Sequence, residues 1–112
     1  MSITPQDIAK MLDHSTLQPN LTQEDIRKGC EIALRYGTAS VCARPGDMPL
    51  VAELLKGSDV KVCTVIGFPH GNHKPQIKLA EAQAAAYRTA KQIAFKGCHY
   101  RQDIAYRALA AS

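Results

Sequence analysis

Hydrophobic residues between Thr22 and Gly37 recur at the spacing of an α-helix. The apolar positions are Ile26, Cys30, Ala33 and Leu34. Thr22 precedes them with Asp25 three residues later, which is the pattern of a capping box, and Gly37 follows as a stop signal. The pattern therefore predicts an amphipathic helix that ends at Gly37.

Two shorter stretches carry helix signals of the same kind. "TPQDIAKML" offers Thr4 as a cap and Pro5 at the first helical position, followed by apolar residues at helical spacing. "DMPLVAELLKG" places Pro49 in a first turn and Gly57 after the last turn. We expect a lead-in helix and a third helix at these places.

"LDHSTLQPN" holds a brief apolar step and a polar turn, which is consistent with a short strand that ends in a loop. Two later segments, "TASVCARPG" and "DVKVCTVIGFP", are short runs without polar alternation. Such runs are typical of strands buried on both faces, as in a parallel sheet covered by helices. The order helix, strand, helix, strand, helix, strand favours right-handed parallel crossovers. The loop "GFPHG" after the third strand looks suited to ligand contact.

The pattern changes after Gly71. "PQIKLAEAQAAAYRTAKQIAFKG" is rich in helix-forming residues and predicts one long helix from Pro75 to Lys96. Gly97 interrupts it, and 98–112 predicts a terminal helix. We expect a single domain over 1–112, with an α/β part in 1–74 and a basic helical tail in 75–112.

Composition limits the function classes. The net charge of +4 is concentrated after His70, where seven basic residues face two acidic ones. No aromatic and glycine pattern of a nucleic-acid module accompanies this charge, so a solvated helix face is the preferred interpretation. The sequence has neither a membrane-spanning run nor a secretory signal pattern, which predicts a cytoplasmic protein.

The cysteines and histidines show no metal-binding or disulfide pattern. Four cysteines at irregular spacing predict free thiols. His70 and His73 lack a carboxylate or cysteine companion nearby in the sequence, so no metal is expected there. We expect no cofactor.

Several separated motifs resemble one enzyme family. The segments "MLDHSTLQPNLTQEDI", "YGTASVCARP", "MPLVAELLKGSDVKVCTVIGFPHGN" and "LAEAQAAA" occur in the order and spacing of the N-terminal part of the 2-deoxyribose-5-phosphate aldolases. The similarity covers about residues 10 to 86. It implies part of a (β/α)₈ barrel, with about three of its parallel strands. The family reaction cleaves 2-deoxyribose 5-phosphate to glyceraldehyde 3-phosphate and acetaldehyde through a lysine Schiff base.

The resemblance also implies pocket residues, which the family places at the carboxyl ends of the strands. Asp13 matches an aspartate after the first strand, and Ser15 stands where relatives usually carry threonine. Cys42 matches a cysteine facing the substrate, and Phe68 matches a nearby loop aromatic. An alternative from residue type alone is that Asp13 caps a loop and that Cys42 is a small core residue.

The family's catalytic positions have no clear match. Alignment of the tail places Ala94 at the family's relay aspartate, and Lys91 and Gln92 at an earlier acidic pair. No lysine matches the Schiff-base position, and the family's phosphate loops are not matched. Lys91 and Lys96 are interpreted as solvated helix residues. The resemblance therefore implies a truncated relative that is catalytically impaired or inactive and that binds, regulates or assembles.

Two alternatives stay open from the sequence. One is an active aldolase whose site is completed by oligomerisation, with a sugar phosphate as ligand. The other is a fragment or reading-frame product of a longer gene. Because three parallel strands leave two open sheet edges, we expect a homo-oligomer, such as a dimer that exchanges its C-terminal helices.

Overall fold

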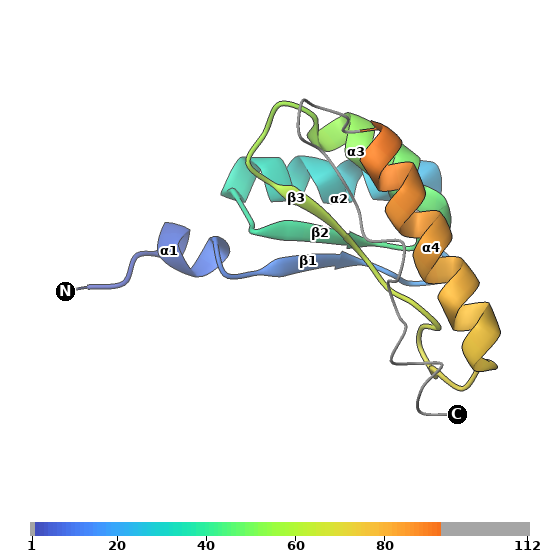
Figure 1. The fold of residues 1–112 in the computed structure, drawn as a ribbon. Coiled ribbons are helices and arrows are strands. Elements are labelled where there is room, and N and C mark those ends of the chain that lie inside the picture. Colours follow the sequence, from blue (N-terminus) through green and yellow to red (C-terminus); the bar gives the residue numbers. More distant parts are fainter. Residues whose placement is uncertain (1, 93–112) are drawn as a thin grey trace. The chain divides into compact units, whose positions relative to one another are not determined.

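The computed structural model describes residues 2–92. The chain divides into two compact units, Met1–Thr64 and Val65–Ser112. The first unit holds a three-stranded parallel sheet in the order β1-β2-β3 (Figure 1). Its strands are β1 (Asp13–Thr16), β2 (Ser40–Ala43) and β3 (Lys61–Thr64). Its helices are α1 (Pro5–Ala9), α2 (Gln23–Tyr36) and α3 (Met48–Leu55), with a 3₁₀ turn, η1 (Pro45–Asp47), before α3. The predicted alternation of helices and parallel strands is confirmed.

Side-chain caps fix where α2 begins and ends. The Thr22 hydroxyl accepts a hydrogen bond from the Asp25 N–H, and the Asp25 carboxylate accepts from the Thr22 N–H at 2.8 Å. Gly37 closes the helix with φ 65°, a left-handed conformation that suits glycine. The same reciprocal box joins Thr4 and Asp7 at the start of α1. These local signals explain why the helix starts were predictable.

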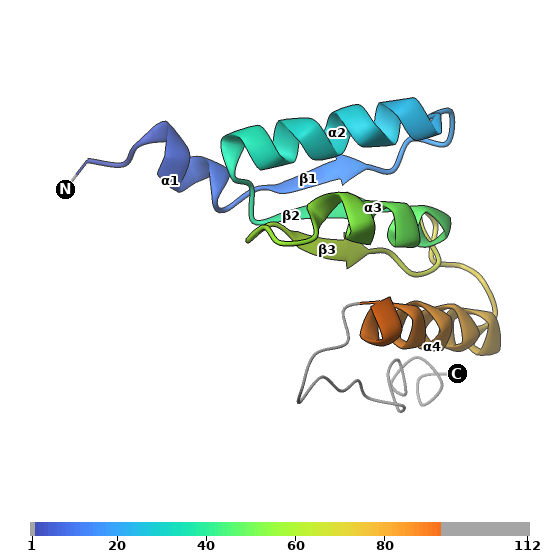
Figure 2. The same ribbon diagram turned by 90° about the horizontal axis from the view of Figure 1, so that it is seen from above.

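Helices α2 and α3 lie on the same face of the sheet (Figure 2). The core lies between these two layers. It is built from Ile26, Cys30, Ala33, Val41, Ala43, Val51, Leu55 and Val60. Right-handed crossovers of successive units put their helices on one side of the sheet.

The three parallel strands with flanking helices that a partial barrel predicts are confirmed in Met1–Thr64, where α2 and α3 pack on one face of the sheet. Strand residues alternate between the faces, so Val41 and Ala43 enter the core while Cys42 points to the opposite face. Among the described strands, β2 lacks polar alternation because it is buried on both of its sides, with Val41, Cys42 and Ala43 all buried.

The second unit begins after β3 with a loop that leads into α4 (Pro75–Gln92). Gly67 and Gly71 both have positive φ, and the Gly71 N–H donates to the Gly67 carbonyl. The Glu81 carboxylate of α4 accepts from the Gly67 N–H at 2.8 Å, and Lys78 Nζ donates to the Gly71 carbonyl at 3.1 Å. The "GFPHG" loop is thus tied to the helix that follows it.

The long helix expected from Pro75 to Lys96 begins at Pro75 and is helical to Gln92. The long helical C-terminal extension is not supported, because the rest of that helix and the terminal helix over 98–112 lie outside the described residues. Ala94, Lys96 and Cys98 lie there as well. The single-domain expectation stays a prediction.

Candidate functional site

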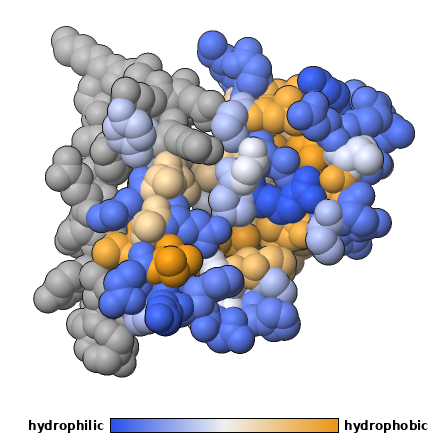
Figure 3. Space-filling model, turned by 90° about the vertical axis from the view of Figure 1, so that its right-hand side faces the viewer, coloured by the Kyte–Doolittle hydropathy of each residue, from blue (hydrophilic) through white to orange (hydrophobic). Residues whose placement is uncertain are grey.

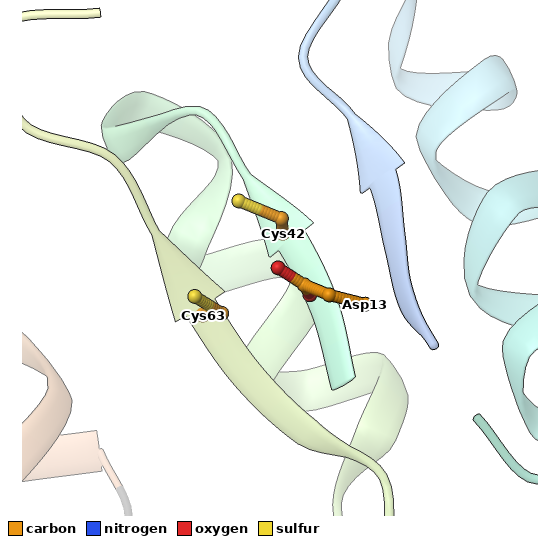
Figure 4. A group of neighbouring side chains, drawn as sticks. All are labelled: Asp13, Cys42 and Cys63. Atoms are coloured by element: carbon orange, nitrogen blue, oxygen red, sulfur yellow. The ribbon is translucent and has the colours of Figure 1, made fainter. Parts of the chain in front are cut away.

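The sheet face opposite α2 and α3 brings together Asp13, Cys42 and Cys63, one residue from each strand (Figure 4). One carboxylate oxygen and the two sulfur atoms all lie within 4.8 Å of one another. Parallel register explains the meeting, since Cys42 pairs with Cys63 and paired residues point to the same face. The site is therefore a product of strand pairing.

Asp13 is held in place by the neighbouring strand. The Ser40 hydroxyl donates a hydrogen bond of 2.6 Å to Asp13 Oδ1, and the two residues are partners in the β1–β2 register. The family pattern led us to expect Asp13 after the first strand, and this is wrong, because Asp13 is the first residue of β1. The apolar residue Leu12 precedes the strand, and its carbonyl accepts the Ala39 N–H at 3.0 Å.

Cys42 lies in the central strand and is buried, with 7% of its surface exposed. Burial raises the pKa of its thiol to about 11, and the nearby Cys63 and Asp13 add to the increase. A charged thiolate would lose hydration there and would face a second negative group. At neutral pH the Cys42 thiol is protonated, which makes it a weak nucleophile.

Ser15 and Phe68 are the other residues that the family pattern led us to expect in the pocket. Ser15 is exposed and pairs with Cys42 in the register, so it shares the face of Asp13. Phe68 lies in the second unit with half of its surface exposed. His70 and His73 are exposed in the same loop. The structure thus brings Asp13, Ser15 and Cys42 to one sheet face and leaves the role of Phe68 a prediction.

Sequence reasoning missed Cys63 and Ser40. Strands β2 and β3 each carry a Val-Cys pair, Val41-Cys42 and Val62-Cys63. In-register pairing of these two segments would have predicted adjacent sulfur atoms. Cys30 was correctly placed on the apolar face of α2, where burial raises the pKa of its thiol. Cys30, Cys42 and Cys63 are all free cysteines.

Arg44, directly after β2, was also missed. Its guanidinium donates to the carbonyls of Gln18, Pro19 and Leu21 and forms an ion pair with Asp47. It thereby fixes the loop after β1 at the carboxyl edge of the sheet. An arginine between a strand and a proline turn gives no sequence signal for these partners.

Comparison with known proteins points to one family. The chain is 51% identical over 87 residues to a deoxyribose-phosphate aldolase of Caldanaerobacter subterraneus subsp. tengcongensis, covering 78% of this chain and 38% of the relative. A deoxyribose-phosphate aldolase of Clostridium perfringens is 47% identical over 88 residues, 79% of this chain and 39% of the relative. The chain resembles the N-terminal part of the deoxyribose-phosphate aldolases. No protein-family profile matches it.

Solved structures agree with this similarity. The tetrameric deoxyribose phosphate aldolase of Aeropyrum pernix superposes with a TM-score of 0.69 at 34% identity, over 75% of this chain and 36% of that one. An aldolase named QR15 gives 0.66 at 33% identity, over 72% of this chain and 36% of that one. The resemblance expected from the motifs is confirmed, and the chain spans less than two fifths of the curated relatives it matches.

The three parallel strands with flanking helices are the architecture expected for a section of an aldolase barrel. Within residues 2–92, no helix combines the length and apolar content that crossing a membrane requires.

Proposed function

We propose that this chain is a deoxyribose-phosphate aldolase homologue that carries one wall of a sugar-phosphate pocket and, as the 112-residue polypeptide, does not cleave 2-deoxyribose 5-phosphate. The observation that carries the proposal is the convergence of Asp13, Ser15 and Cys42 on the sheet face opposite the helices. These are the positions that match the family's pocket. Asp13 and Ser15 are exposed and can hydrogen-bond to sugar hydroxyls.

We expect no turnover because no lysine of the described strands suits the role of the Schiff-base nucleophile. A Schiff-base lysine needs a pKa lowered by burial or by a neighbouring cation, so that its amine is neutral near pH 7. The three described strands contain one lysine, Lys61, which is exposed at the amino end of β3. A solvated lysine there lacks the dry environment that imine formation uses.

The test measures turnover and imine formation separately. The 112-residue chain is produced in a host without its own aldolase and assayed with 2-deoxyribose 5-phosphate by coupled detection of glyceraldehyde 3-phosphate. Borohydride is then added, and intact mass reports any trapped adduct. We expect neither turnover nor adduct, while the Clostridium perfringens enzyme gives both.

Turnover together with an adduct on one lysine would overturn the proposal and favour an active site completed by assembly. If one of the tail lysines is that nucleophile, a variant with Lys91 and Lys96 replaced by alanine should lose both the turnover and the adduct. Turnover that survives in this variant with no adduct would point instead to a contaminating enzyme, and repeating the assay after a second purification step decides between the two.

We also propose that the chain assembles with copies of itself. β1 and β3 are the outer strands of the described sheet, and open edges of parallel sheets are normally covered. A groove of about 320 Å³ runs along the β1 side, lined by residues that include His14, Thr16, Gly29 and Ile32. The tetrameric relative from Aeropyrum pernix supports assembly in general. A dimer, cytoplasmic residence and a role in deoxyribonucleotide catabolism stay predictions.

A further inference from the structure

The cluster of Asp13, Cys42 and Cys63 offers chemistry that the aldolase resemblance does not use. It combines one hard oxygen donor with two sulfur donors, and the three come from three different strands. We propose that Asp13, Cys42 and Cys63 together bind one thiophilic divalent cation, with Zn²⁺ as the natural occupant. The metal site shares Asp13 and Cys42 with the proposed sugar-phosphate pocket, but it rests on the positions of the three donor atoms and is tested without a sugar phosphate.

The donor set matches zinc. Zn²⁺ binds cysteine sulfur at about 2.3 Å and carboxylate oxygen at about 2.0–2.2 Å, and sites with three protein ligands keep a fourth position for water. Two sulfurs on one tetrahedral zinc ion lie about 3.8 Å apart by that geometry. The three donor atoms lie within 4.8 Å of one another, so binding requires a closing movement of at most about 1 Å. Side-chain rotation can supply this.

The sheet prearranges the ligands. Cys42 and Cys63 are direct partners in the β2–β3 register, which fixes the two sulfurs side by side. Asp13 lies in β1, on the other side of β2 from Cys63, and the Ser40 hydroxyl of β2 holds its carboxylate through a hydrogen bond of 2.6 Å. Such outer partners orient metal ligands and affect affinity. Asp13 is exposed and gives the ion a route from solvent, whereas Cys42 supplies a buried anchor.

Binding requires both thiols to release their protons to solvent. Two thiolates and one carboxylate around the divalent ion then give the site a net charge of −1. Protons and the metal ion compete for the same sulfur atoms. Fewer protons compete as pH rises, so the apparent affinity increases with pH. The neighbouring negative groups that disfavour a bare thiolate become favourable once a cation lies between them.

The experiment uses Cd²⁺ as an optical probe for the site. The full chain is reduced, freed of metal and titrated with Cd²⁺ while thiolate-to-metal charge-transfer absorption is followed in the ultraviolet. We expect one equivalent to bind, with the absorption increasing from pH 6 to pH 8, and Zn²⁺ to displace the probe. Cys42→Ser and Cys63→Ser should each remove about half of the absorption and weaken binding at least tenfold.

Two further variants test the geometry with little risk to folding. Asp13→Asn keeps both sulfurs, so the absorption should persist with weaker binding, and Ser40→Ala should weaken binding about tenfold through loss of the support for Asp13. Cys30→Ala is the matched control, because Cys30 lies in the helix-facing core and should leave the titration unchanged.

Circular dichroism verifies the fold of every variant. The proposal is overturned if the reduced chain shows no charge-transfer absorption, if Cys30→Ala abolishes it, or if Cys42→Ser and Cys63→Ser leave it unchanged. It is also overturned if neither Asp13→Asn nor Ser40→Ala alters the affinity, since the oxygen ligand would then be absent.

Discussion

The side chain of Cys42 connects the local sequence to the properties of the candidate site. It lies in the middle strand, between Asp13 of β1 and Cys63 of β3, with its backbone carbonyl accepting the Thr16 hydroxyl at 3.1 Å. Burial, with Cys63 and Asp13 close by, raises the pKa of the Cys42 thiol and keeps it protonated at neutral pH. The family motif identified Cys42, but only the register reveals the neighbours that set its chemistry.

Alkaline pH should therefore destabilise the fold through Cys42. Its pKa is raised to about 11 in the folded chain, so the unfolded thiol ionises first and the stabilisation present below about pH 9 is lost as pH rises to about 11. We expect the wild type to lose about 2 to 3 kcal/mol more than Cys42→Ser over this interval. Urea unfolding of both reduced proteins, at steps of pH, measures the difference. Parallel pH profiles for the two proteins would contradict the assignment.

The packing around Gly29 leaves no room for a side chain at this position. A Cβ at this position would lie 2.7 Å from Thr16 Cγ2, and Thr16 is buried with its hydroxyl bonded to the Cys42 carbonyl. Overpacking of this kind costs about 1 to 3 kcal/mol, against about 1 kcal/mol gained by alanine in a helix. Gly29→Ala should therefore lower the free energy of unfolding by about 1 kcal/mol.

The clash has a direct control. Thr16→Ser removes the Cγ2 methyl and keeps the hydroxyl, so in that background Gly29→Ala should become neutral or stabilising. Chemical unfolding of the four proteins of this cycle gives the coupling energy. Additive effects of the two substitutions would show that Thr16 is not what excludes a side chain at position 29.

At the scale of the elements, local sequence signals determined what could be predicted. Thr22, Asp25 and Gly37 predicted the limits of α2, because caps act within a few residues. Strand pairing gives no such local signal, so the contact of Cys63 with Cys42 was missed and Asp13 was placed after β1. The one-sided helix packing follows from crossover handedness and strand alternation acting together, which the apolar runs alone do not encode.

The capping box of α2 makes a pH-dependent contribution that can be measured. Hydrogen bonds from the Thr22 N–H and hydroxyl lower the pKa of Asp25 below its ordinary value. The stabilisation is therefore present above the unfolded pKa of aspartate and is lost as pH falls through the lower folded value. Asp25→Asn should flatten the acid limb of the stability profile below about pH 4.

Glu24→Gln is the matched control for this effect. It removes a carboxylate from the same first turn and leaves the bonds between Thr22 and Asp25 in place. Thermal unfolding between pH 2.5 and pH 6 compares the three proteins. An acid limb that Glu24→Gln flattens as strongly as Asp25→Asn would mean that general helix-terminal charge, not the box, is responsible.

At the scale of the whole molecule, exposed apolar surface is the feature that the described residues leave to be explained. Hydrophobic side chains reach the surface among hydrophilic ones on the face drawn in Figure 3. In Met1–Thr64 the large exposed ones are Ile3, Ile8, Met11, Leu12, Ile32, Leu34 and Tyr36. Such surface combined with open strand edges favours association with a second copy.

Assembly predicts that stability depends on protein concentration. If copies associate only when folded, mass action stabilises the folded form, and the melting temperature increases with concentration. We expect size-exclusion chromatography with light scattering to give a dimer or larger oligomer at micromolar concentration, and the melting temperature to rise over a hundredfold concentration range. Ile32→Lys, which places a charge in the groove beside β1, should shift the population toward monomer. Leu34→Lys, exposed to a similar degree on the same helix, tests whether any added charge has this effect. A folded monomer whose melting temperature is independent of concentration would refute self-association. It would also show that the fold is stable with its sheet edges uncovered.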